Sequence, residues 1–452
     1  MYHLFFMVTH KAWKKNLLIK YLCPRDFSRG EMEEIMKINQ YTIPRIAIAF
    51  FISIQIFSYT LSFLNLIYGI DTWQNFIVDI IYKIRNISFY VTIISIILYN
   101  KITFEDLILM SLFLFSYLFM ILIFPDNMEY FKNVQPLIKF SICVFMAISS
   151  KMLNFDELKK ILKWESRVIV ICLLLTIQIN IDFMNQNIVY MEYANAISIG
   201  IALLLYYSIF DSSIIDFVLS IIGLISLLLY GSRGSLVTLL ALLIIFLWLK
   251  IRNKKILILG CIFLFVFALF GPMFVSTIIT KMINLGIDSR TIEKLINGNL
   301  FKSNDRIMIY EYLISIILKK PILGTGICGD RYFLPLRFTG TDATYAHNLF
   351  IEILVDYGLI IGSLLILLLL YIIIKFLFKE IDISRKAFFY VFFIIGFIQL
   401  MISRSWITEP NFFIFFSILL TYSTNKRIQY VIKGNSSLRK YQIKDEVIKC
   451  NH

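Results

Sequence analysis

The sequence predicts an all-α, polytopic integral membrane protein, and three observations support that fold class. Of the 452 residues, 59% are hydrophobic and only 16% are charged, whereas soluble domains hold about 45–50% apolar and about 25% charged residues. The apolar residues gather in runs of roughly 20, the length of helix that crosses a bilayer core of roughly 30 Å. Lysines and arginines cluster between some of these runs, as is typical of loops that stay in the cytoplasm.

About 12 transmembrane helices are expected, each of about 20 residues. Their approximate ranges are 46–68, 77–99, 104–124, 134–152, 167–184, 194–210, 213–231, 234–251, 255–277, 347–375, 386–403 and 410–424. The second range contains Lys83 and Arg85. Because charged side chains are costly in the bilayer core, its first half can lie in the interface instead.

The basic residues set the predicted orientation. Their clusters precede the first span and follow the fourth, eighth, tenth and twelfth, so twelve spans place every cluster on one side. The positive-inside rule makes that side cytoplasmic. The chain then divides into a cytoplasmic lead (1–45), nine spans (46–277), one long extracytoplasmic loop (278–346), three spans (347–424) and a cytoplasmic tail (425–452). A multi-pass protein of the plasma membrane is expected.

Charge and cysteine usage exclude some function classes. The net charge of +14 reflects this topology, and no soluble basic domain accompanies it, so nucleic acid is not an expected partner. The six cysteines are scattered without metal-ligand spacing. The cysteines therefore predict no metal site. No cofactor is expected either.

The first motif that could carry chemistry is GSRG at 231–234. Gly231 and Gly234 interrupt two apolar runs and predict a tight outer turn that displays Arg233. One interpretation is a hairpin whose arginine snorkels to the interface. The other is a phosphate site, because a lone arginine is unusual in a short outer turn and its guanidinium can fork onto phosphate oxygens.

The second motif spans 302–326. Ser303 can cap a helix that runs to about Lys320 and places Arg306 near its N-terminus, the end that favours anions. An apolar stripe at helical spacing predicts that this amphipathic helix lies on the outer membrane surface. The stripe comprises Ile307, Tyr310, Ile314 and Ile317. The alternative is an interfacial helix with a solvated arginine.

The third motif is GTDATYAHNLFIEILVDYG at 340–358. Asp342 or Thr344 can cap a helix that begins near His347, at the outer end of the tenth span. A histidine at an interface can be a packing residue, or it can be a general base, since neutral imidazole accepts a proton readily at pH 7.

Polar side chains continue from this motif into the tenth span. They recur at helical spacing: Asn348, Glu352 and Asp356. Because polar groups are costly inside a membrane, we expect them to face a cavity or other helices. Gly358 and Gly362 allow close helix packing or a break in the helix.

Two arginines and one histidine are thus expected at one membrane face, and their order resembles the O-antigen polymerase and O-antigen ligase superfamily of bacterial envelope glycosyltransferases. The matching stretches are SRG at 232–234, DRIMIY…KKPILGTG at 305–326 and HNLFIEILVDYGLIIG at 347–362. The specific match covers roughly 230–362, and the N-terminal half matches only in hydropathy.

The resemblance implies a metal-independent transfer between polyprenyl-diphosphate-linked saccharides at the outer face of the plasma membrane. Arg233 and Arg306 would bind the diphosphate, and His347 would activate the acceptor hydroxyl. Asn348 beside it, and Arg404 near the outer end of the eleventh span, are further candidates for substrate binding. For Arg404 the alternative is snorkelling to the interface. Flippases and chain-length regulators are candidate assembly partners.

Polymerisation of repeat units into a surface polysaccharide, such as capsule, O-antigen or exopolysaccharide, is the favoured function. The motifs do not distinguish it from ligation of the glycan to another acceptor. A lipid-linked oligosaccharide flippase is an alternative of a different class. A flippase is expected to carry charged residues deep in several spans, whereas the basic residues of interest here cluster on one side.

Overall fold

The computed structural model describes the chain in ten stretches and at a few isolated positions between residues 60 and 119. The stretches are 46–57, 73–99, 122–132, 155–179, 189–230, 233–251, 304–338, 345–378, 382–402 and 404–424. Every element in them is helical and none is a strand, so the all-helical prediction is confirmed for these residues. The predicted spans 134–152 and 255–277, the lead and the tail lie outside the described residues.

Most helices of the described stretches fall on predicted ranges, but the helix predicted at 167–184 spans 155–179 instead, and a further helix at 329–337 lies within the predicted long loop. In chain order they are α3 (Trp73–Tyr99), α6 (Phe155–Ile179), α8 (Val189–Phe210), α9 (Ile214–Tyr230), α10 (Arg233–Lys250), α13 (Asn304–Lys319), α14 (Gly329–Arg337), α15 (Leu349–Leu377), α16 (Ile383–Phe393) and α17 (Pro410–Thr424). Helix α16 continues into a π-helical turn, Ile394–Ile398, and a 3-10 turn, Gln399–Met401.

Three stretches of the described chain are long and apolar enough to cross a membrane: Met191–Phe210, Leu349–Leu377 and Ile383–Met401. Shorter apolar helices fall on other predicted spans, at Ile46–Phe57, Ile214–Leu228, Gly234–Lys250 and Pro410–Leu419. These helices agree with a membrane protein. The count of twelve spans stays a prediction.

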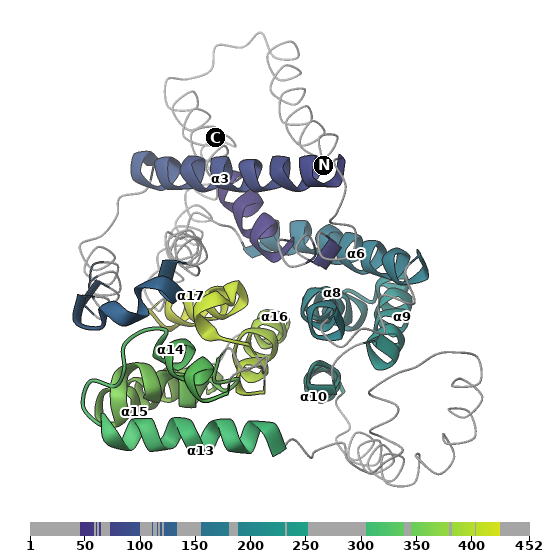
Figure 1. Cartoon of the computed structure of the whole chain (residues 1–452). Helices are drawn as coiled ribbons and strands as arrows, with labels where there is room; N and C mark the ends of the chain where they lie inside the picture. Colours follow the sequence, from purple (N-terminus) through teal and green to yellow (C-terminus); the bar gives the residue numbers. More distant parts are fainter. Residues whose placement is uncertain are drawn as a thin grey trace, which may run out of the picture.

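Helix α8 is the centre of one half of the molecule and packs against α6, α9, α10 and α16 (Figure 1). Small residues let the neighbours approach it closely. A Cβ on Gly200 would lie 3.0 Å from side-chain methyls of Ile169 and Val170 in α6. Helix α9 instead turns a run of apolar side chains outward. An apolar helix face of this size outside the core is typical of contact with lipid.

Helix α13 runs beside α15 in the other half (Figure 1), and its apolar stripe differs from the predicted one. The buried face consists of Ile309, Leu313, Ile316 and Ile317. Ile307 and Ile314 of the predicted stripe are 55% and 47% exposed, so they lie outside this buried face. Their placement on the outer membrane surface stays a prediction. The helix is apolar on several faces, and packing against α15 selects the buried one.

Helix α15 breaks at Gly358, which has φ 79° and ψ 170°. The predicted break is therefore confirmed at this glycine. The break leaves the carbonyls of Val355 and Asp356 without helical partners, and the turn after α13 supplies them. The backbone N–H of Thr325 donates to Val355 O at 2.8 Å, and that of Gly326 donates to Asp356 O at 3.0 Å. Irregular backbone at membrane depth is tolerated only when protein satisfies it in this way.

Candidate functional site

The three sequence motifs meet at residues 399–402, which we call the 399–402 connector, between α16 and α17. A Cβ on Gly234 would lie 2.8 Å from Ile402 Cγ2, so the first turn of α10 packs directly on the connector. The Nη1 of Arg306 donates to Ile402 O at 2.5 Å. The Nδ2 of Asn348 donates to Met401 O at 3.2 Å. Three segments that are separate in the chain thus contact the same connector.

Arg306 lies near the N-terminus of α13, and the start of this helix at Asn304 agrees with the predicted start. Its contact with Ile402 O uses one of the five N–H donors of a guanidinium group. The first turn of a helix also carries N–H groups that have no partner within the helix and that favour anions. This end of α13 is chemically suited to a phosphate.

His347 precedes α15 and has a left-handed backbone, with φ 54°. Burial and the positive charge of Arg306 together lower the pKa of its imidazole to about 4. Its Nδ1 atom is buried and makes no hydrogen bond with the described residues. The imidazole is therefore neutral at pH 7, lies close to a cation, and has a buried nitrogen without a hydrogen-bond partner among the described residues.

Asn348 caps α15, so the predicted caps Asp342 and Thr344 are wrong for this helix. Its Oδ1 accepts the backbone N–H groups of Phe350 at 3.0 Å and of Ile351 at 3.2 Å. An asparagine immediately before the helix satisfies these donors better than a residue several positions away. The helix therefore begins at Leu349, and His347 lies just before it.

Two of the predicted site residues are placed less completely. Arg233 is the first residue of α10, beside the connector, and its side chain lies outside the described part of the structure. Arg404 is 5% exposed. Its Nε donates to Asn195 Oδ1 at 2.7 Å, and its Nη1 is paired with Glu409. These contacts hold Arg404 within the protein interior.

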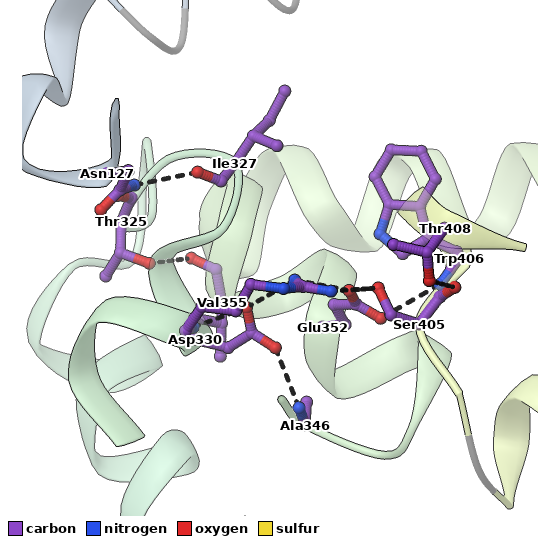
Figure 2. Close-up of polar contacts among 11 residues, drawn as sticks. Asn127, Thr325, Ile327, Asp330, Ala346, Glu352, Val355, Ser405, Trp406 and Thr408 are labelled. Atoms are coloured by element: carbon purple, nitrogen blue, oxygen red, sulfur yellow. Dashed lines mark hydrogen bonds and ion pairs between the residues drawn. The ribbon is translucent and has the colours of Figure 1, made fainter. Parts of the chain in front are cut away.

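A buried charged cluster beside the site was missed at the sequence level. Arg331 of α14 pairs with Asp330 at 3.3 Å and with Glu352 at 3.4 Å, and it donates to Ser405 Oγ at 2.7 Å. Figure 2 shows Asp330, Glu352 and Ser405 converging from α14, α15 and the segment before α17. The polar stripe of α15 had indicated a buried partner for Glu352, but nothing in the pattern of the long loop distinguished Arg331 from its other arginines.

The described residues contain no group of three or more histidine, cysteine, aspartate or glutamate side chains placed to hold a metal ion. The chemistry that the described groups can perform is anion binding by Arg306 and proton acceptance by His347, and Arg233 begins α10 beside the same connector.

The segment that carries this geometry matches a known family. Residues 218–367 match the O-antigen ligase family. This range includes the whole of α10, α13 and α14, and the broken part of α15. No curated protein matches the chain at a significant level. The family match confirms, over residues 218–367, the resemblance to the O-antigen polymerase and ligase superfamily that the three motifs indicated.

Proposed function

We propose that the protein polymerises polyprenyl-diphosphate-linked oligosaccharide repeat units into a surface polysaccharide at the outer face of the plasma membrane. The observation that carries the proposal is the meeting of three motifs at the 399–402 connector: Gly234 through packing, and Arg306 and Asn348 through hydrogen bonds. The family supplies the substrate class, a lipid-linked glycan.

In the proposed reaction, Arg233 and Arg306 bind the diphosphate of the donor. His347 accepts the proton of the acceptor hydroxyl, and the resulting oxygen nucleophile attacks the anomeric carbon of the donor glycan. The bond between that carbon and the diphosphate oxygen breaks, and polyprenyl diphosphate leaves with the bonding electrons. The neutral state of His347 suits this role, because only neutral imidazole can accept a proton. The arginines stabilise the charge that develops on the leaving group.

Asn348 and Arg404 are assigned less direct roles in substrate binding. Asn348 caps the N-terminus of α15, and its side-chain amide donates a hydrogen bond to Met401 O. Arg404 is committed to Asn195 and Glu409 within the interior. A contact between substrate and either side chain therefore requires that these hydrogen bonds be shared or exchanged.

The decisive experiment uses purified full-length protein and a defined lipid-linked repeat unit as the only substrate. A ladder of longer lipid-linked products supports polymerisation. Absence of the ladder, together with transfer once a different acceptor is added, identifies a ligase instead. A protein that moves the substrate across vesicles without forming any new glycosidic bond contradicts both assignments and is the result expected of a flippase.

The proposal also places residues 278–346 outside the cell and both termini inside. Arg337 is exposed at the end of α14 and offers a site for the test. An Arg337→Cys variant should react with a membrane-impermeant thiol reagent in intact cells whose wall admits the reagent. The unsubstituted protein is the control, since burial protects Cys328 in the same loop. Labelling that requires lysis would contradict the topology.

A further inference from the structure

We propose that Asp330 and Arg331 are positioning residues for His347, and that they hold the turn at 345–347 in the conformation that the base requires. This inference rests on the proposed function, because it assigns a role to residues that support the base. It concerns a buried cluster that neither binds the diphosphate nor accepts the proton in the proposed reaction. The pair acts through its contacts with Tyr345 and Ala346.

Asp330 holds the backbone of the turn. Its Oδ2 accepts the N–H of Ala346 at 2.9 Å (Figure 2). Its Oδ1 accepts the N–H of Arg331 at 2.8 Å and faces the Arg331 guanidinium at 3.3 Å. Both carboxylate oxygens are therefore committed, and Asp330 is fully buried. The aspartate joins α14 to the residue immediately before His347.

Arg331 contacts the aromatic side chain of the turn, Tyr345. Its guanidinium lies 5.9 Å from the centre of the Tyr345 ring, within the range of a cation–π contact. The same ring lies 3.9 Å from the centre of the His347 ring. Tyr345 therefore contacts both the arginine and the imidazole. Displacement of the guanidinium would remove one of the contacts that position the ring against His347.

Arg331 is itself fixed from two other elements. Glu352 of α15 and Ser405, which follows the connector, bind its guanidinium. Ser405 also donates to Glu352. The cluster thus connects α14 and α15 to the segment that anchors Arg306. Such contacts keep the base and the diphosphate-binding arginine at a constant separation.

The backbone of His347 explains why external support is needed. Its φ of 54° lies in the left-handed region, which residues with a Cβ rarely adopt unless the surroundings impose it. Asp330 constrains the preceding residue through Ala346, and the cap of Asn348 constrains the following one. Loss of the Asp330 contact releases one side of the turn, so the imidazole can leave the acceptor.

The test measures turnover per folded protein and donor affinity for Asp330→Ala, His347→Ala and the double variant. Asp330→Ala should lower turnover up to about 100-fold, the scale of loss from a small misplacement of a reacting group. Donor affinity should change less than about twofold, because Arg306 keeps its own anchor. In the His347→Ala background the Asp330→Ala change should have little further effect, since residues that act as a unit are not additive.

Asp330→Asn keeps the shape of the side chain and one acceptor oxygen, and it replaces alanine if that variant yields too little folded protein. The matched control is Asp216→Ala, which breaks another buried aspartate–arginine pair, with Arg167 of α6. That variant should lower the amount of folded protein and leave turnover per folded molecule unchanged. A positioning role predicts a loss of turnover at Asp330 alone.

The possible results separate the two proposals. Normal turnover in both Asp330 variants, or losses that multiply in the double variant, would overturn the positioning role while leaving the function intact. Full turnover in His347→Ala would instead contradict the base assignment itself. A selective loss of turnover at Asp330 that disappears in the His347→Ala background supports both.

Discussion

Two ion-pair clusters in this protein differ in the polar groups that lie beside them. In the first, between α6 and α9, Arg167 Nε donates to Asp216 Oδ1 at 2.6 Å and Arg167 Nη2 donates to Oδ2 at 3.1 Å. Lys163 adds a third contact to the same carboxylate. Every carboxylate oxygen of Asp216 has a cationic partner, in the bidentate geometry typical of structural pairs.

The second cluster lies beside the candidate site. Arg331 is shared among Asp330, Glu352 and Ser405. Close to it, His347 Nδ1 is buried without a hydrogen bond among the described residues. Buried polar groups are nearly always paired, so an unpaired one is costly and marks a place where a ligand can supply the partner. From this difference we expect the α6–α9 pair to serve the fold and the cluster around Arg331 to serve the proposed site.

The largest expected difference between the two regions is in the loss of stability when a glycine is replaced by alanine. Gly358→Ala in α15 should abolish most folded protein, because the new Cβ would lie 2.7 Å from Gly324 N and 2.8 Å from Ile322 O at a φ of 79°. Neither backbone atom can move away as a side chain can. Gly200→Ala in α8 meets only side-chain methyls and should cost about 1–3 kcal/mol. Thermal unfolding in detergent measures both, and equal stability of the two variants would contradict the comparison.

The next largest effect is on turnover, and it is expected only for substitutions in the candidate site. His347→Gln should reduce turnover by about 10²–10⁴-fold, because glutamine can form a hydrogen bond but cannot accept the proton. Donor affinity should persist, since Arg306 is anchored independently on Ile402. Asn348→Ala loses a helix cap and should have a smaller effect on turnover. Product formation and donor binding are measured together, and normal turnover in His347→Gln would remove the base from the mechanism.

Arg306 tests whether geometry or charge matters at the site. Arg306→Ala should lower turnover by about 10²–10³-fold, the usual result of removing one donor from a developing negative charge. Arg306→Lys should recover only part of the loss, because lysine keeps the charge without the planar fork. The control is Arg337→Ala, an exposed arginine at the end of α14, which should retain full turnover. Complete rescue by lysine would show that charge alone is sufficient.

The pH dependence of catalysis gives a smaller and more specific signal. Because the pKa of His347 in the free protein is about 4, kcat/KM should stay level on acidification to about pH 5 and fall near pH 4. The diphosphate of a bound donor offsets the charge of Arg306, so the corresponding fall in kcat should occur at higher pH. Coincident pH profiles for kcat and kcat/KM would contradict a donor bound beside this histidine.

The smallest expected effect is on stability. The pKa of His347 is about 4 when folded and about 6.5 when unfolded, so the unfolded chain binds more protons between these values. Stability therefore falls as the pH drops from about 6.5 to about 4, by up to about 3 kcal/mol. His347→Gln removes this contribution. The difference in Tm between the two proteins across that pH range measures it, and a difference independent of pH would contradict the lowered pKa.

Much of the local structure follows from the sequence alone. The apolar runs predict helices because only a hydrogen-bonded helix carries so much apolar surface across a membrane. Asn304–Lys319 forms the expected helix before Pro321, and Gly358 breaks α15 as its position between apolar segments allowed. The order of Arg233, Arg306 and His347 along the chain indicated the family before any packing was known. These features depend on residues that are close together in the sequence. Hydrophobic periodicity, helix caps and helix-breaking residues therefore predict them.

Only the tertiary structure decided how these parts meet. The face that α13 buries depends on α15, because the helix is apolar on more than one side. The pairing of Arg331 with Glu352 and Ser405 joins segments up to 74 residues apart, and no spacing rule relates them. The low pKa of His347 requires both its burial and the approach of Arg306, a residue from another helix. Charge placement and desolvation are long-range properties of the packed chain, so they arise only when the three motifs come together at the 399–402 connector.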